Sequence, residues 1–505
     1  MTDYPDLIAK RAALSPTKLA LRDLKGERAL TYRSLDAASA KCAALLQSKG
    51  IGAEDRVAIL CRNRIEFFEA LFACAKVGAI LVPLNWRMPA AELQGILSNC
   101  QPTLIFVGEE DLPTLEQASP AAPVVKLDDN SADGYQALCE TSPPIICRDF
   151  WPADQIWYLL YTSGTTGAPK AVMQTYQMAV INYTNVRQAI DLQEDDRTLN
   201  FLPLFHTAGI NLYTLPMLFA GAEVSILPGF DVDETMGLLA NGALDVFFGV
   251  PAVYQQISLH PAFAEIDCSR VRHWGCGGAP LQDVLVEAFA ERGALVCNGY
   301  GMTETGPTAY LMHHSHVRRK IGSVGMTQMM TAARLLGGDG APVGPNEPGE
   351  LQLKGPGITP GYWGAPDATK AAFTDDGWLK TGDLASADEE GFTYIVGRSK
   401  EMYISGGENV YPAEVENMLA RHPAVLEAAV VGVPDEKWGE VGRAFVQLRD
   451  DQCAGADELM RYARDNLAAY KAPKSFVFVT EFPRTAAGKI QKHLLTAGGA
   501  DDAAI

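Results

Sequence analysis

Apolar and polar residues follow one another in two alternating patterns along residues 1–320. Short apolar runs, such as Val57–Leu60 and Ile80–Pro83, are typical of buried strands. Between them, apolar residues recur at helical spacing, as in Glu66–Val77, which is followed by the helix-terminating Gly78. Strands that alternate with helices of about 10–15 residues indicate βαβ units and parallel sheets. The pattern therefore predicts an α/β fold.

The pattern changes near residue 320, where Gly, Pro and short alternating runs such as Gly349–Leu353 indicate antiparallel strands and a small β-barrel. A mixed segment of helices and strands follows Arg398. We predict a large N-terminal domain at 1–398 and a small, mobile C-terminal α+β domain at 399–505. The large domain would contain parallel-sheet α/β subdomains at 1–170 and 171–320 and a β-rich subdomain at 321–398.

The composition is that of an ordinary folded enzyme. Hydrophobic residues make up 48% of the 505 residues and charged residues 20%, which excludes disorder as the main state. The formal net charge of −19 excludes attraction of nucleic acid or anionic lipid by bulk charge, so any phosphate must be bound locally. No apolar stretch is long enough for a membrane span. Ten cysteines without a CxxC pair are typical of a reducing compartment, and we expect a cytoplasmic protein.

The most informative motif runs from Thr162 to Lys170 and follows the apolar strand Ile156–Tyr161. Two glycines free its backbone to curl, four hydroxyls offer hydrogen bonds and Lys170 adds a positive charge, so the segment can cradle a polyphosphate. Its spacing differs from GxxxxGK[ST], which excludes a Walker A loop. An ordinary turn rich in Ser, Thr and Gly is the alternative. The candidate residues are Thr162, Ser163, Gly164, Thr165, Thr166, Gly167 and Lys170.

This motif resembles the phosphate loop of the adenylate-forming superfamily, which contains acyl-CoA synthetases, luciferases and the adenylation domains of peptide synthetases. Further segments resemble the other motifs of that superfamily, in the same order, at Asn298–Glu304, Gly377–Asp383, Gly397–Glu401 with Ser405–Asn409, and Pro483–Lys489. The resemblance covers nearly the whole chain. The chain is most similar to bacterial acyl-CoA synthetases that act on fatty or aryl acids.

The resemblance implies an ATP-dependent carboxylic acid–CoA ligase that forms AMP. In the first half-reaction, the carboxylate attacks the α-phosphate of ATP and gives an acyl-adenylate and pyrophosphate. In the second, the thiol of CoA attacks the acyl carbon and AMP leaves. Both partners of the first step are anions, so the protein must screen charge and hold an in-line geometry. Mg²⁺, ATP and CoA are the implied co-substrates.

The motifs carry a set of nucleotide-binding residues. By resemblance, Glu304 and Thr162 would hold Mg²⁺, which prefers oxygen ligands and shares phosphate oxygens. Asp383 and Arg398 would bind the ribose and phosphate of AMP, and Tyr300 would stack on adenine. The other nucleotide-binding residues implied by the motifs are Gly277, Gly278, Ala279, Asn298, Gly299, Gly301, Met302 and Thr303.

Two further residues join Glu304 in the predicted catalytic set. Lys489 would neutralise the charge that develops between the carboxylate and the α-phosphate. His206 would control access of the carboxylate to the acyl pocket. A general base is not required there, because the attacking carboxylate is already ionised.

The predicted acyl pocket consists of small or apolar residues, apart from His206 at its entrance. By resemblance, its walls are His206, Ala208, Leu212, Gly275, Gly277 and Met302. None of them is a cation that could pair with a second carboxylate, which favours a monocarboxylic acid. A fatty acid of medium or long chain is the first expectation. An aryl acid of the cinnamate, ferulate or benzoate type is the alternative.

The small C-terminal domain carries the predicted groups for the second half-reaction. Ser405, Gly406 and Gly407 would line the path of the pantetheine arm, because glycine lets a ligand pass close to the backbone. Lys400 occupies the position at which the resembling family places a hinge. Rotation about it would exchange one face of the small domain for another between the half-reactions.

Three other functions are alternatives to an acid–CoA ligase. An amino-acid adenylation domain usually has an Asp near residues 205–213, and this stretch contains no acid. A luciferase-like oxidative activity and a non-catalytic nucleotide-binding protein are further alternatives, the latter disfavoured by the presence of Lys489 and Glu304. The cluster His313, His314 and His316 is expected to be a solvated loop rather than a metal site. We expect small-molecule substrates as partners, with a second copy of the chain in a homodimer as a further candidate, and neither nucleic acid nor an integral membrane segment.

Overall fold

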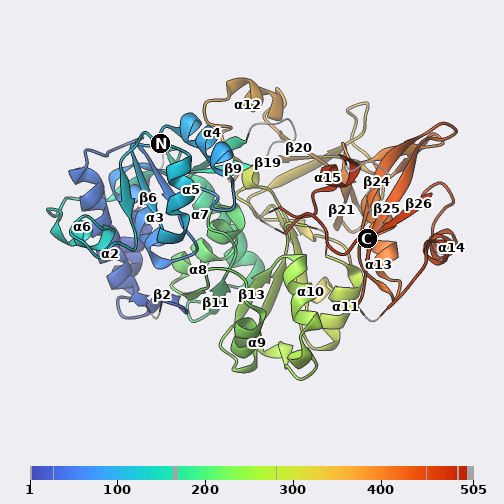
Figure 1. Cartoon of the computed structure of the whole chain (residues 1–505), viewed down its shortest axis with the longest axis horizontal. Helices are drawn as coiled ribbons and strands as arrows, with labels where there is room; N and C mark the ends of the chain where they lie inside the picture. The colour runs from blue at the N-terminus through green and yellow to red at the C-terminus, as the bar shows by residue number, and fades with distance from the viewer. Residues whose placement is uncertain are drawn as a thin grey trace.

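The computed structural model describes residues 3–26, 28–162, 169–279, 281–450, 452–485 and 488–497. The described residues form several sheets with helices packed between and around them (Figure 1). The blue elements of about the first 140 residues and the red elements that follow Arg398 occupy opposite ends of the molecule in Figure 1, and α10 (Pro251–Leu259) and α11 (Asp283–Glu291) lie beside the latter. Within the described part of the chain, no helix has both the length and the apolar character that crossing a membrane requires.

The first large sheet has strand order β10-β9-β5-β4-β6-β7. Its strands are parallel, except that β10 pairs antiparallel with β9. The strands are β4 (Arg56–Leu60), β5 (Ile80–Pro83), β6 (Leu104–Val107), β7 (Val124–Lys126), β9 (Ile156–Thr162) and β10 (Lys170–Thr175). The connecting helices are α2 (Tyr32–Ser48), α3 (Ile65–Val77), α4 (Ala90–Cys100), α5 (Leu112–Gln117) and α6 (Tyr135–Thr141). The short β1 (Asp3–Pro5) pairs with β8 (Phe150–Pro152).

A second group of strands forms two neighbouring sheets, β11-β12-β2-β3 and β13-β14-β15-β16-β17. These strands are β2 (Leu19–Asp23), β3 (Ala29–Thr31), β11 (Arg197–Asn200), β12 (Glu223–Ile226), β13 (Val246–Gly249), β14 (His273–Cys276), β15 (Val296–Tyr300), β16 (Tyr310–Leu311) and β17 (Met326–Thr327). Their helices are α1 (Leu7–Leu14), α7 (Tyr176–Ile190), α8 (Thr214–Ala220), α9 (Val232–Ala240), α10 (Pro251–Leu259) and α11 (Asp283–Glu291). The parallel pairs β13–β14 and β14–β15 bring the ends of these strands together.

A one-turn π-helix at Ala208–Leu212 precedes α8. The pattern of apolar residues predicts one helix over Leu212–Phe219, but α8 begins at Thr214. The carbonyl of Gly209 accepts hydrogen bonds from the side chains of Asn200 and Thr214 at 2.9 and 2.8 Å. Single π-helical turns are frequent at functional sites, and this one contains two of the predicted acyl-pocket residues.

The strands that follow residue 330 form two mainly antiparallel sheets. The first is the sheet β18 (Ala332–Leu336), β19 (Gly349–Lys354), β20 (Leu379–Ala387) and β21 (Thr393–Arg398), with α12 (Pro366–Ala372) beside it. The second contains β22 (Tyr403–Ser405), β23 (Glu408–Val410), β24 (Val425–Asp435), β25 (Gly439–Leu448) and the parallel β26 (Ser475–Phe478). Its helices are α13 (Pro412–Ala420), α14 (Ala456–Asn466) and α15 (Lys492–Ala497).

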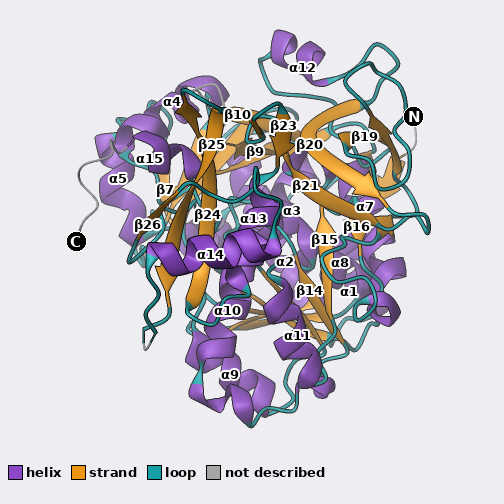
Figure 2. Cartoon of the chain, turned by 90° about the vertical axis from the view of Figure 1, so that its right-hand side faces the viewer, coloured by secondary structure: helices purple, strands orange, loops and turns teal. Residues whose placement is uncertain are grey.

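The part of the chain after Arg398 has an apolar core of its own. In Figure 2, α14 crosses in front of β24 and β25, and the buried residues between helices and sheet include Val415, Leu419, Val430 and Leu459. Several polar contacts join this part to the preceding residues, among them two hydrogen bonds of 3.1 Å from the N–H and the hydroxyl of Ser399 to the carbonyl of Gly382. The Arg421 guanidinium lies 2.6 Å from a carboxylate oxygen of Asp283, and the amides of Gln255 and Gln282 both donate to the carbonyl of Leu426.

Candidate active site

Glu304 lies in a short 3₁₀ turn directly after β15. Its carboxylate accepts a hydrogen bond of 2.8 Å from the hydroxyl of Tyr362, and its carbonyl accepts one of 2.8 Å from the backbone of Thr359. Burial raises the pKa of Glu304, while the hydrogen bond from Tyr362 and the charges of Arg398 and Lys170 oppose that rise. The buried carboxylate therefore has one neutral donor and two more distant cations around it.

Asp383 is the second buried carboxylate of the site. Strands β20 and β21 pair in a register that places Asp383 opposite Arg398, and the two side chains approach to 3.1 Å. The hydroxyl of Tyr300 donates to the other oxygen of Asp383 at 2.5 Å. These contacts join the end of β15 to β20 and β21. The structure thus brings together three residues that the sequence predicts to surround AMP.

The ends of β14 and β15 lie close to each other at their glycines. A Cβ atom added at Gly277 would lie 3.2 Å from the carbonyl oxygen of Gly299, and Gly278 has a φ of +87°, which favours glycine. Ala279 follows in the same turn, and Asn298 at the end of β15 is buried. A side chain at Gly277 would press on the Gly299 carbonyl, so the glycine permits the close approach of these two backbone segments.

The ends of the predicted phosphate loop meet at the hairpin β9–β10. Thr162 and Lys170 face each other across this hairpin, and the Thr162 hydroxyl donates to the Lys170 carbonyl at 3.4 Å. The Lys170 ammonium lies 5.4 Å from the centre of the Tyr362 ring. Lys170 and Glu304 therefore share Tyr362 as a neighbour. The other loop residues, Ser163, Gly164, Thr165, Thr166 and Gly167, lie outside the described residues.

Lys489 lies in a short loop that bends back on itself. The loop is closed by Thr485, whose backbone N–H donates to the Lys489 carbonyl at 2.7 Å and whose hydroxyl accepts from the Lys489 N–H at 3.1 Å. Burial lowers the pKa of the Lys489 ammonium, and the positive charge of Arg398 lowers it further, while Glu401 and Asp383 raise it. The structure therefore places Lys489 within the electrostatic reach of the Asp383–Arg398 pair.

His206 follows the turn Pro203–Phe205 and precedes the π-helical turn. Its Nδ1 accepts a hydrogen bond of 3.2 Å from the backbone N–H of Ala208. Burial lowers the pKa of His206 to about 4. The imidazole is therefore neutral at physiological pH.

The predicted acyl-pocket residues meet a cluster of aromatic side chains. A Cβ atom added at Gly275 would lie 2.4 Å from the hydroxyl of Tyr213 and 2.9 Å from the ring of Phe248. The same Phe248 ring lies 3.3 Å from the position of a Cβ at Gly277. The Tyr213 hydroxyl is held 2.7 Å from Nε2 of His273, and both side chains are buried.

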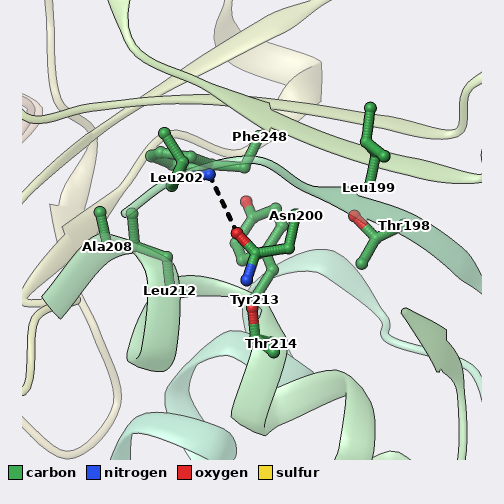
Figure 3. Close-up of a pocket in the computed structure, with 9 residues that line it drawn as sticks. All are labelled: Thr198, Leu199, Asn200, Leu202, Ala208, Leu212, Tyr213, Thr214 and Phe248. Carbon is green, nitrogen blue, oxygen red and sulfur yellow. Dashed lines mark hydrogen bonds between the residues drawn. The ribbon is translucent and has the colours of Figure 1, made fainter. Parts of the chain in front are cut away.

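A cavity of about 10 Å³ lies beside Tyr213 and Phe248 (Figure 3). A void of this size holds about one water molecule, so it is not room for an acyl chain. Figure 3 shows Ala208 and Leu212 on one side and Tyr213 with Phe248 across from them. Its lining residues are Thr198, Leu199, Asn200, Leu202, Ala208, Leu212, Tyr213, Thr214 and Phe248. Met302 begins the turn that contains Glu304, and its N–H donates to Thr305.

Ser405, Gly406 and Gly407 form the turn between β22 and β23. Gly406 and Gly407 have φ values of +62° and +91°, a region that L-residues with side chains rarely adopt. A Cβ atom at Gly406 would lie 2.8 Å from the indole of Trp438, and the Gly406 N–H donates to the Trp438 carbonyl at 2.9 Å. The turn is thus packed against the β24–β25 hairpin and needs glycine for its shape.

The donors around Glu304 fit a magnesium ion that is bound mainly by substrate phosphates. Among the described residues, no group of three or more His, Cys, Asp or Glu side chains could hold a metal ion by itself. Mg²⁺ in nucleotide enzymes is commonly held by one or two carboxylates together with phosphate oxygens and water. The Tyr362 hydroxyl donates to Oε1 of Glu304 and leaves the negative charge that would attract the ion uncancelled.

Comparison with known proteins gives the family. The model of the AMP-binding enzyme family matches residues 8–363, and that of the AMP-binding enzyme C-terminal domain matches residues 414–489. The chain belongs to the AMP-binding enzyme family. The predicted fold class, with its parallel α/β sheets and its smaller C-terminal part, is confirmed by this match and by solved structures of similar enzymes.

Three curated relatives are similar over almost their whole length. A feruloyl-CoA synthase of Amycolatopsis sp is 40% identical over 483 residues, 96% of this chain and 96% of the relative. An indoleacetate–CoA ligase of Aromatoleum aromaticum is 37% identical, with 97% of each chain covered. A long-chain-fatty-acid–CoA ligase of Mycobacterium tuberculosis is 34% identical, again with 97% of each covered.

Among solved structures, an o-succinylbenzoate CoA synthetase of Bacillus subtilis in complex with ATP and a magnesium ion is 30% identical. The two chains align with a TM-score of 0.88 over 98% of this chain and 100% of that one. This chain is therefore an acid–thiol ligase that forms AMP and uses ATP, CoA and Mg²⁺. The predicted activity and co-substrates are confirmed. The relatives differ in the acid that their names give, so they leave the acid open.

The sequence patterns did not identify Tyr362, Tyr213 or His273. Tyr362 lies in a loop rich in Gly and Pro, Gly355–Gly364, and a tyrosine in such a loop is the only signal that could have drawn attention to it. Tyr213 and His273 lie in apolar surroundings, and each resembles an ordinary core residue. Their pairing appears only when β14 and the π-helical turn come together.

Proposed function

We propose that the acid is aromatic, with a planar ring and one carboxylate, rather than a long-chain fatty acid. The observation that carries this proposal is the position of Tyr213, whose hydroxyl fills the space in front of Gly275. His273 holds that hydroxyl in place, and Phe248 packs edge-on against the Tyr213 ring at 5.1 Å between centroids. A long alkyl chain would have to displace this buried cluster.

The same residues suit a flat ring. Gly275 lies in β14 and Gly277 directly follows this strand, so the two glycines, two residues apart, face the same side without side chains. Phe248 borders both of them. Aromatic rings bind well in thin slots with aromatic walls, where edge-to-face contacts add to the burial of apolar surface. The feruloyl and indoleacetate ligases among the relatives act, by their names, on acids that contain such rings.

We also propose the division of labour among the site residues. Lys489 stabilises the negative charge as the carboxylate reaches the α-phosphate. Asp383 and Arg398 bind the ribose and phosphate of AMP, and the glycines of β14 and β15 with Tyr300 bind adenine. Glu304 and Thr162 hold Mg²⁺, which supplies charge neutralisation at the phosphates.

The second half-reaction uses the C-terminal part of the chain. The turn Ser405–Gly407 lines the path of the CoA thiol, and its two left-handed glycines leave the backbone uncovered. We propose a large domain at 1–398, a small domain at 399–505 and a hinge at Lys400. The two family models support this division, because the model of the AMP-binding enzyme ends at residue 363 and that of the C-terminal domain begins at residue 414.

A substrate panel tests the proposed acid. ATP–pyrophosphate exchange is measured with ferulate, indole-3-acetate, benzoate, decanoate and palmitate. We expect kcat/KM to be at least about tenfold higher for the best aromatic acid than for palmitate, since a rigid pocket discriminates by this much for a few carbon atoms. Higher kcat/KM for palmitate than for every aromatic acid would contradict the proposal.

A pair of variants locates the specificity in the structure. Tyr213→Ala removes the side chain in front of Gly275, so longer alkyl acids should become better substrates relative to the aromatic ones. Tyr213→Phe keeps the ring and serves as the matched control, which should keep the wild-type ranking. An unchanged ranking in Tyr213→Ala, with the protein folded, would place the end of the pocket elsewhere.

A further inference from the structure

Lys492, at the start of α15, lies between two carboxylates. Its ammonium is 2.7 Å from Oε1 of Glu416 and 3.3 Å from Oε2 of Glu401. Glu416 belongs to α13 and also accepts the backbone N–H of Val430 at 2.7 Å. The three charged side chains are largely withdrawn from solvent, with 19–36% of each exposed. A half-buried cation with two carboxylate partners is a specific arrangement rather than a loose surface pair.

The position of this triad relates it to Lys489. Lys492 follows Lys489 by three residues, and Glu401 follows the predicted hinge residue Lys400. The charge of Glu401 acts on Lys489 as well, because it raises the pKa of that ammonium against the effect of burial. Two lysines that are three residues apart therefore lie within the field of the same carboxylate, and Lys492 is the one that contacts it.

We propose that Lys492 is a positioning residue for adenylation, which holds Glu401 so that this carboxylate does not pair with Lys489. The proposal rests on the role proposed above for Lys489. An ammonium that is paired with a neighbouring carboxylate brings little positive charge to the reacting phosphate, and its side chain points away from it. With Glu401 bound to Lys492, the charge of Lys489 stays available to the two anions that must meet.

The three members of the triad all follow residue 400. If the chain turns at Lys400, the triad therefore moves as one unit and remains intact in either arrangement of the two domains. Its loss should then affect the half-reaction that needs Lys489 and leave the other half-reaction unchanged. A role in general stability would lower both half-reactions together.

The test separates the half-reactions in Lys492→Met. Adenylation, followed by ATP–pyrophosphate exchange, should fall about 100-fold, the loss typical of a catalytic group displaced by about 1 Å. Thioester formation from CoA and a synthetic acyl-adenylate should keep the wild-type rate. Lys492→Arg should retain adenylation, because a guanidinium can also bind both carboxylates. Lys471→Met, which breaks the exposed pair of Lys471 with Glu414 in the same part of the chain, is the matched control and should behave as wild type.

The decisive variant is the double substitution Lys492→Met with Glu401→Gln. It removes the carboxylate that would capture Lys489, so adenylation should recover to within about tenfold of wild type, most of the loss having come from displacement. Adenylation that stays as low as in Lys492→Met would overturn the proposal. So would wild-type adenylation in Lys492→Met. If Lys489→Ala, measured alongside, adenylates normally, the failure lies in the proposed role of Lys489 instead.

A second measurement does not depend on the folding of Lys492→Met. In Glu401→Gln the charge that raises the pKa of Lys489 is gone, so the ammonium should lose its proton at lower pH. The alkaline limb of the adenylation profile should therefore shift to lower pH, with near wild-type adenylation at neutral pH. An unshifted alkaline limb, or a tenfold loss at neutral pH, would contradict competition between the two lysines for Glu401.

Discussion

Glu304 and Lys489 are the two opposite charges of the proposed site, and they are held in different ways. Glu304 is fixed by a neutral group, the hydroxyl of Tyr362, in the interior of the larger part of the chain. Lys489 is fixed through its loop, which is fastened by ion pairs of neighbouring residues. Arg484 pairs with Glu427, and Lys492 pairs with Glu416 and Glu401.

The difference follows from where each charge is needed. A phenol satisfies one oxygen of a buried carboxylate without cancelling its charge, so Glu304 can still attract a metal ion. A lysine in a loop has a long, flexible side chain, and ion pairs at the flanking positions fix the loop while its own charge stays uncompensated. In both places the charge to which we assign the chemistry has no ion pair within the described part of the chain. The following predictions test that comparison, beginning with the largest effect.

Removal of the Lys489 cation should have the largest effect on adenylation. Lys489→Ala should lower the rate of adenylation about 100- to 1,000-fold, the effect of losing one preorganised electrostatic contact. Thioester formation from a synthetic acyl-adenylate should stay close to wild type. The two rates are measured separately by pyrophosphate exchange and by thioester assay. Equal losses in both half-reactions would show that Lys489 does not act in adenylation alone.

Restricting the backbone at the proposed hinge should leave adenylation intact and reduce thioester formation. Lys400→Pro restricts φ to about −65° and should trap the arrangement in which Lys489 lies near Asp383. We expect nearly normal pyrophosphate exchange and acyl-CoA production reduced about 100-fold, because the second half-reaction cannot be reached. Wild-type acyl-CoA production would exclude residue 400 as the hinge. The matched control is Lys400→Ala. A proline at Lys380 would not serve as a control, because Lys380 lies in β20.

Neutralising the anion should raise the requirement for magnesium. Glu304→Gln keeps the shape and one acceptor oxygen but removes the charge. The Mg²⁺ concentration for half-maximal adenylation should increase about 10- to 100-fold, the range typical of damage to a metal site. The measurement is a Mg²⁺ titration at saturating ATP. A titration that superimposes on that of the wild type would remove Glu304 from the metal site.

Loss of the neutral donor should have a smaller effect of the same kind. Tyr362→Phe removes the hydroxyl that holds Glu304, and the magnesium requirement should increase about fivefold, equivalent to a hydrogen bond of about 1 kcal/mol. Tyr183→Phe removes a hydroxyl that accepts from Arg187 at the surface and is the matched control. If Glu304→Gln shifts the titration and Tyr362→Phe does not, the carboxylate is held by other groups.

His206 should produce the smallest change in activity and a change in the pH dependence of stability. Its pKa is lowered to about 4 by burial, whereas in the unfolded chain it is about 6.5. The unfolded state therefore binds more protons between these values, and the free energy of unfolding should rise with pH across this window. His206→Gln should lose that part of the slope in urea unfolding. An unchanged slope would mean that the imidazole ionises in the folded protein.

The sequence predicted the local elements well where short-range signals are strong. The predicted strand Ile80–Pro83 is β5, and the predicted helix Glu66–Val77 is α3, which begins one residue earlier. Asp383 and Arg398, both chosen from motifs, do lie opposite each other across two strands. In these cases the pattern of apolar residues and the turn-forming glycines carry the information.

The contacts that hold the site could not be predicted in this way. Tyr362 and Glu304 are 58 residues apart, and Tyr213 and His273 are 60 apart. No periodicity or spacing relates residues at such separations, since their approach depends on the packing of whole sheets. The π-helical turn at 208–212 was missed for a related reason, because it depends on the side chain of Asn200 reaching the carbonyl of Gly209.

Among the described residues, the polar contacts of the C-terminal part with α10, α11 and the residue before α11 are one ion pair and two long hydrogen bonds. Arg421 has 59% of its side chain exposed, and the two glutamine amides lie 3.3 and 3.4 Å from the Leu426 carbonyl that they share. Exposed pairs of this kind are worth about 0–1 kcal/mol each, and water can replace them at little cost. These three contacts would therefore oppose a rotation of the proposed small domain only weakly. Since dissolved salt screens exposed charges, the ionic strength of the medium should itself shift the balance between the two domain arrangements that we propose.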